Sequence, residues 1–160
     1  MPYTPVDNRL GLQPIESTET VQFHPVGTRC RAVDPTFGEC EFIYLKGVAS
    51  TAVGDLVIYD TYAGTTTRAV AGSRGPCAVA MSANVLNQFG WYQIAGAGPV
   101  NSSTVLANGN VYVTATAGTV DDAVVVGDKV DGARFKTANG TPAAGKAVVQ
   151  LAFPSLNANG

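Results

Sequence analysis

Histidine, cysteine and the carboxylates are the residue types that could carry catalysis, and this chain of 160 residues spaces them sparsely. His24 is the single histidine, so a hydrolase built on a Ser-His or Cys-His pair would have to use it. Its neighbours Phe23 and Pro25 are typical of the end of a strand, and the sequence has no Gly-x-Ser-x-Gly motif. We therefore interpret His24 as a strand-end or surface residue and predict that the protein is not an enzyme.

A metal site would need clustered ligands, and neither the thiols nor the carboxylates have a suitable spacing. Cys30, Cys40 and Cys77 stand 10 and 37 residues apart, which matches no zinc or redox motif, and their odd number prevents complete pairing within the chain. The aspartates at 121, 122, 128 and 131 lack the alternating oxygens and the closing Glu of a calcium loop. We predict free, buried thiols, solvated turn carboxylates, and neither metal nor cofactor.

Residues 75–120 contain no Asp, Glu, Lys, Arg or His. Burying an unpaired charge costs far more free energy than burying an amide, and charged residues are depleted at interface cores. The segment therefore forms either the interior of a β domain or a surface that a partner covers. In both cases it favours structure and assembly over chemistry.

The composition excludes several classes of partner. The net charge is −2 and there is no basic run, so we expect no nucleic-acid partner. No stretch approaches the 18 or more apolar residues of a membrane helix, and the first residues show no signal-peptide pattern, so we expect no membrane partner and no secretion. Only 14% of the residues are charged, which suits a surface partly covered in an oligomer.

The pattern along the chain predicts an all-β fold, a β-barrel or β-sandwich with an extended N-terminal arm. Pro2, Pro5 and Pro14 break any helix in residues 1–20, which form the predicted arm. Residues 21–153 form the predicted β domain, either undivided or as sub-lobes 21–100 and 101–153, and residues 154–160 form a tail. The single helix candidate is a short one at residues 82–88. Strands are predicted at 28–33, 40–45, 56–59, 65–70, 77–81, 90–95, 110–117 and 147–153.

Residues that favour tight turns lie between these predicted strands. The dipeptides at 108–109, 131–132 and 139–140 are Asn-Gly or Asp-Gly, which tight hairpins favour. Residues 51–57 (TAVGDLV) resemble residues 124–130 (VVVGDKV), 73 positions later. The likeness indicates either two related β lobes or one common turn solution reached twice.

Residues 90–94 (GWYQI) are the sharpest local feature. On a strand, Trp91 and Gln93 share one face, and Tyr92 and Ile94 share the other. One interpretation is core packing. The other is a subunit contact anchored by Trp91 or Tyr92, together with Gln93 and Phe89, because Trp and Tyr dominate interface hot spots.

Residues 38–48 (GECEFIYLKGV), the turn at 53–55 (VGD), residues 75–81 (GPCAVAM) and residues 90–94 resemble capsid decoration, or cement, proteins of tailed bacteriophages. The likeness covers about residues 35–100. It implies a mostly β protein, often trimeric, that binds the outside of a capsid and bridges neighbouring major-capsid subunits. It also implies synthesis in the cytoplasm of a host bacterium and a final location on the virion surface.

The sequence and the resemblance together predict a structural virion protein whose partners are itself, as a homotrimer, and the major capsid protein. The predicted capsid-contact residues lie on the arm: Tyr3, Val6, Arg9, Leu10, Leu12 and Ile15. One alternative is a carbohydrate- or receptor-binding β module of a phage tail or head fibre. A third hypothesis is an enzyme with an unrecognised carboxylate or Cys40 site.

Overall fold

In the computed structural model, which describes residues 3–6 and 11–157, the chain is all-β, as predicted. The strands are β1 (Thr4–Pro5), β2 (Arg29–Asp34), β3 (Gly38–Lys46), β4 (Leu56–Tyr59), β5 (Thr66–Arg68), β6 (Gly75–Ala80), β7 (Phe89–Asn101), β8 (Asn110–Val113), β9 (Val120–Asp121), β10 (Lys129–Phe135) and β11 (Lys146–Leu156). Their order is β1-β2-β3-β7-β6-β11-β10-β8-β9, with β4 pairing β5 and β6 beside this path. No helix in the described part of the chain is long and apolar enough to cross a membrane.

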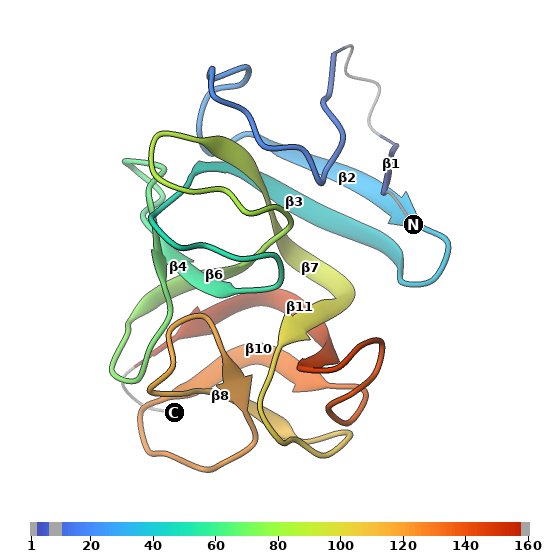
Figure 1. The fold of residues 1–160 in the computed structure, drawn as a ribbon, viewed down its shortest axis with the longest axis vertical. Coiled ribbons are helices and arrows are strands. Elements are labelled where there is room, and N and C mark those ends of the chain that lie inside the picture. Colours follow the sequence, from blue (N-terminus) through green and yellow to red (C-terminus); the bar gives the residue numbers. More distant parts are fainter. Residues whose placement is uncertain (1–2, 7–10, 158–160) are drawn as a thin grey trace.

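Strand β7 joins the two halves of the molecule (Figure 1). Its first residues pair with β3 and β6, with Tyr92 opposite both Ile43 and Ala80. Its last residues pair with β11, with Val100 opposite Ala147. Figure 1 accordingly shows β2 and β3 in the upper half, β8, β10 and β11 in the lower half, and β7 running between them.

The alternation predicted for residues 90–94 is confirmed. Trp91 packs in one core cluster with Phe42 and Tyr44, while Tyr92 and Ile94 belong to a second cluster on the opposite face of the β3–β7 pair. A third cluster combines residues of β4 and β6 with residues of β7, β8, β10 and β11. The sequence on either side of residue 100 therefore contributes to one shared core.

The described part of the N-terminal segment packs on its own domain, whereas the sequence predicted an arm that contacts a capsid. Thr4 and Pro5 pair with Val33 and Ala32 of β2. The side chains of Tyr3 and Ile15 lie in the same cluster as Trp91. These apolar residues need no regular period, because an extended segment can fill the gaps left on an existing sheet face.

Both copies of the repeated sequence form the same turn. Gly54 and Gly127 have φ angles of 90° and 87°, which favour glycine. The N–H groups of Asp55 and Asp128 donate three residues back to the carbonyls of Ala52 and Val125, at 3.1 Å in each case. Strands β4 and β10 begin directly after these aspartates.

Two local predictions are wrong. Residues 82–88 form no helix and instead connect β6 to β7 through turns, because two turns of helix are too short to persist without strong packing. Asp131-Gly132 lies inside β10 rather than in a hairpin turn: Gly132 has a φ of 76°, and the register with β11 shifts between Asp131 and Ala133, where β11 contributes the surplus residues.

Candidate interaction surfaces

The side chains predicted to form a subunit interface are buried inside this chain. Trp91, Tyr92 and Gln93 are each 1% exposed or less, and Phe89 is half-buried against Tyr44 with ring centroids 6.1 Å apart. Core packing is therefore the interpretation that the structure supports. Neither a second subunit nor a glycan can reach the face of Trp91 in this conformation.

The cover over Trp91 comes from the segment that precedes β2. The ring of His24 lies 5.5 Å from that of Trp91 and 5.2 Å from that of Tyr44, measured between centroids. Its Nε2 atom is hydrogen bonded to Gln13 Oε1 at 2.5 Å. His24 is thus a packing residue, and no local sequence pattern indicates that its segment returns over this face of the sheet.

Two of the four predicted capsid-contact residues that the structure describes are buried in the interior. Tyr3 is 7% exposed and Ile15 is fully buried, while Leu12 is half-buried. The ring of Tyr3 meets that of Phe42 edge-on at 5.0 Å. Val6 is exposed, and Arg9 and Leu10 lie outside the described residues. Tyr3 and Ile15 therefore stabilise this chain and are unavailable for contact with a capsid.

Three consecutive valines between β9 and β10 form the most unusual exposed feature. Val124, Val125 and Val126 are 78%, 47% and 90% exposed. The N–H of Leu106, itself strongly exposed, donates to Asp122 Oδ2 at 2.9 Å, which brings a second apolar side chain to the base of this loop. We call these four residues the valine patch. Exposed apolar runs of this kind mark interaction sites in soluble proteins.

Phe153 is an exposed aromatic residue in a strained backbone position. It has a φ of 48°, a left-handed conformation that costs a bulky residue about 1–2 kcal/mol. Its ring is half-exposed and lies 5.7 Å from the guanidinium of Arg29 on β2. Burial raises the pKa of Tyr59, and the nearby positive charge of Arg29 acts in the opposite direction. Phe153, Arg29 and Tyr59 thus lie in one neighbourhood, which we call the aromatic face.

Beside the aromatic face, the β4–β5 hairpin and the start of β6 enclose a groove of about 500 Å³. Threonines 61, 65 and 67 line it, together with Tyr59, Asp60 and Arg74. At the hairpin tip, Asp60 Oδ1 accepts the N–H of Tyr62 at 2.7 Å, and Tyr62 is 97% exposed. The groove combines hydroxyls, one carboxylate and one guanidinium next to an accessible aromatic ring.

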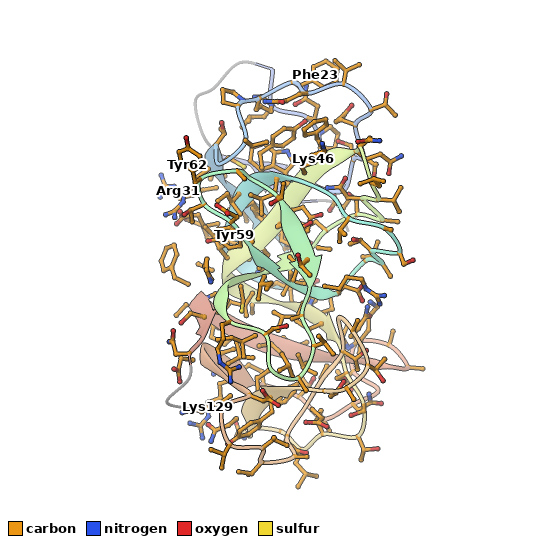
Figure 2. All side chains as sticks on the ribbon, turned by 90° about the vertical axis from the view of Figure 1, so that its left-hand side faces the viewer. Phe23, Arg31, Lys46, Tyr59, Tyr62 and Lys129 are labelled. Atoms are coloured by element: carbon orange, nitrogen blue, oxygen red, sulfur yellow. The ribbon has the colours of Figure 1, made fainter. Side chains whose placement is uncertain are left out.

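A further apolar surface lies at the opposite end of the molecule from the C-terminal strands. Val21, Phe23 and Leu86 are all more than half exposed. Their two segments are joined by a pair of backbone hydrogen bonds between Glu19 and Phe89. Figure 2 shows Phe23 at one end of the long axis and Lys129 of β10 toward the other. We call this surface the N-terminal patch.

All three thiols are buried and none forms a disulfide, as predicted. Burial raises the pKa of Cys40 to about 11 and that of Cys77 to about 12, so both are protonated at neutral pH. Among the described residues, no group of three or more His, Cys, Asp or Glu side chains is arranged to hold a metal ion.

Comparison of the sequence with models of known protein families and with curated proteins finds no match.

Proposed function

We propose that the protein is a structural component of a bacteriophage particle that binds the outside of the capsid and bridges neighbouring major-capsid subunits. The single observation that carries this proposal is the valine patch, because a run of exposed valines is stable in water only at a cost that burial against a partner removes. The resemblance of residues 35–100 to decoration proteins supports the same proposal.

The shape of the molecule supports a bridging mechanism. The molecule is longer than it is wide, and the loops around β8 lie in its lower half (Figure 1), while Phe23 lies at the other end (Figure 2). Apolar surfaces at separated positions allow one subunit to contact two neighbours at once. Linked contacts raise the effective concentration of each, so the bound state persists until several interfaces open together.

The aromatic face is the proposed contact between copies in a homotrimer, in place of the buried Trp91 strand. Arg dominates interface hot spots and Phe is enriched at interfaces, and both Arg29 and Phe153 are exposed, whereas Tyr59 is buried beside them. A cyclic trimer requires that this face meet a different surface of the next copy, because its interfaces are heterologous.

The direct test is the copy number of the protein on purified particles, measured by quantitative mass spectrometry. For a homotrimer, three copies for each threefold position of the capsid are expected. A few copies up to a dozen would move the protein to the tail or neck, and absence from the particles would overturn the proposal.

A pair of variants tests the valine patch itself. Val124→Ser combined with Val126→Ser is expected to reduce binding to undecorated capsids at least tenfold while leaving the fold intact. Val53→Ser is the matched control, because Val53 is also about half exposed but lies outside the patch. Equal binding by the patch variant and the control would contradict the assignment.

A glycan- or receptor-binding role is the second candidate, and the polar groove beside Tyr62 is the observation that favours it. Exposed aromatic rings flanked by hydroxyls and carboxylates suit stacking and hydrogen bonding to sugars. Because Trp91 is buried, its fluorescence is a poor reporter. Calorimetric titration with host-surface glycans, compared between the natural protein and Tyr62→Ala, is the appropriate measurement.

A further inference from the structure

Charge is unevenly distributed along this acidic chain. From Lys129 onward the sequence carries four cations and one carboxylate, a net charge of +3, so the preceding 128 residues carry −5 of the total of −2. The cationic residues belong to β10, β11 and the loop between them. A local basic surface therefore exists that the overall composition conceals.

A shallow groove of about 280 Å³ lies on the exposed face of β8, β10 and β11. Arg134 pairs with Gln150 on one side and with Asn110 on the other, so these three side chains stand next to one another on one sheet face. Lys129 also lines the groove. Gly132 and Ala152 contribute almost no side-chain volume between these longer residues, which leaves the space open.

The groove exists because β10 separates from β8 in its middle. Lys129 pairs with Tyr112 and Arg134 with Asn110, so five residue positions along β10 face only two along β8. Toward β11 the register of β10 also shifts at Gly132, and there the surplus residues belong to β11. The φ of 76° at Gly132 fits glycine, and a Cβ at this position would lie 2.5 Å from the carbonyl oxygen of Ala152.

Some cations of the described chain lack a side-chain partner within it, whereas every described carboxylate has a partner. Each described carboxylate accepts a hydrogen bond or forms an ion pair within the chain; they are Glu16, Glu19, Asp34, Glu39, Glu41, Asp55, Asp60, Asp121, Asp122, Asp128 and Asp131. Lys129 pairs with Asp131 at 3.6 Å. By contrast, Arg134 is exposed and forms no ion pair or side-chain hydrogen bond with any described residue. The exposed Lys136 and the half-buried Lys46 likewise form none with described residues.

We propose that the groove binds the carboxylate side chains of an extended, acidic segment of another protein. The planar guanidinium of Arg134 can bind a carboxylate through two parallel hydrogen bonds, and the amides of Gln150 and Asn110 can donate to the remaining lone pairs. Lys129 provides a second positive charge for a neighbouring carboxylate. The ligand is therefore a short run of Asp or Glu residues.

Two observations separate this ligand from its competitors. The net charge of −5 on the rest of the chain repels a long polyanion, which favours a few carboxylates over nucleic acid. The carboxylates of this chain already have internal partners, which favours a different protein over a second copy. The inference deepens the proposed function, on which it rests for the partner's identity: the acidic segment would belong to the particle protein that this chain covers.

The test is an NMR titration of the full-length, ¹⁵N-labelled protein with a hexaglutamate peptide at low ionic strength. We expect shifts confined to residues 129–134, 150–152 and the neighbouring part of β8. Arg134→Glu should weaken binding about tenfold or more, since each tenfold corresponds to about 1.4 kcal/mol, a typical value for a charge-assisted contact. Lys46→Glu changes the net charge equally, outside the groove, and should change the affinity less than about twofold.

Four results would overturn the proposal: no localised shifts with the peptide, equal weakening by Arg134→Glu and Lys46→Glu, tighter binding of a hexathymidylate oligonucleotide at the same residues, or dissociation of an oligomer by Arg134→Glu in light scattering. The last two would assign the groove to nucleic acid or to a second copy. Because Arg134 is exposed, its variant should fold, and the amide spectrum checks this directly. The copy number on particles tests the proposed function separately, so the two failures are distinguishable.

Discussion

Replacing Asp55 with Asn should destabilise the protein strongly, because this buried carboxylate joins five separate segments. Its Oδ2 accepts the N–H of Ala52 at 2.9 Å and Nε–H of Arg68 at 2.8 Å, and its Oδ1 accepts the side-chain amide of Asn101 at 2.8 Å. Arg68 also donates a hydrogen bond from Nη2 to the carbonyl of Ala117, and Nζ of Lys146 donates to Asn101 Oδ1 at 2.6 Å. The substitution changes one atom while keeping the volume.

An amide at this position cannot satisfy the same partners in either orientation. If the NH₂ group of the asparagine takes the place of Oδ2, it faces two other donors, the N–H of Ala52 and Nε–H of Arg68. If it takes the place of Oδ1, it faces the NH₂ group of Asn101. Asn101 cannot reverse its own amide without presenting NH₂ to Lys146. The guanidinium of Arg68 also loses its counter-charge, and breaking one side of a buried pair costs about 3–5 kcal/mol. The side chain of Arg68 is 27% exposed, so water offsets part of this loss and we expect about 3 kcal/mol.

Urea unfolding followed by fluorescence of the buried Trp91 measures this free energy of unfolding, and the melting temperature should fall by about 6–12 °C. Asp131→Asn is the matched control, because Asp131 is 42% exposed and its pairing distance to Lys129 is 3.6 Å. That variant should lie within about 0.5 kcal/mol of the natural protein. Equal stability of the two variants would refute the view that the Asp55 network joins the halves of the fold.

Three further predictions follow from burial and backbone geometry. Ile15→Ala should lower the free energy of unfolding by about 2–4 kcal/mol, because Ile15 is fully buried; an effect below about 0.5 kcal/mol would restore the idea of a detachable arm. Phe153→Gly should be about 1 kcal/mol more stable than Phe153→Ala, because only glycine adopts a φ of 48° freely, and identical melting curves would contradict the strain. Stability should fall as the pH rises from about 9 towards 12, because burial raises the folded-state pKa of Cys77 to about 12 while the unfolded thiol titrates near 9. Cys77→Val should make the free energy of unfolding fall less steeply with pH, by up to about 1.4 kcal/mol per pH unit in urea titrations. An unchanged pH dependence would contradict the assignment to Cys77.

The strands were largely predictable because each alternates within a few residues. The β4 prediction matches the structure at both ends, and β2, β3 and β11 differ only at their ends. Strand β10 was missed because Asp131-Gly132 has the composition of a hairpin turn, and only the pairing with β11 on both sides of Gly132 shows that the strand continues through it. Local composition cannot distinguish these two uses of one dipeptide.

The interaction surfaces were less predictable, because exposure depends on contacts between distant segments. Trp91 has the residue type of an interface anchor, and nothing near it in sequence indicates that the segment around His24 covers it. The valine patch did have a signal. Val124–Val126 precede the same Gly-Asp pair that ends the earlier turn, so the repeat itself placed these valines in a turn, where their side chains are difficult to bury.

The valine patch is held in place at both ends, and this bears on whether a partner covers it. On one side, Asp122 accepts the N–H of Leu106. On the other side, the buried Asp128 accepts the N–H of Gly72 at 2.8 Å, and its Oδ1 forms an ion pair with Nη1 of Arg74 at 3.6 Å. A loop that only has to connect two strands gains little from such anchoring, whereas a binding loop loses less conformational entropy on association when it is already ordered. Three valines fixed in an exposed position by a buried carboxylate are therefore better explained by a partner surface than by an unconstrained connection.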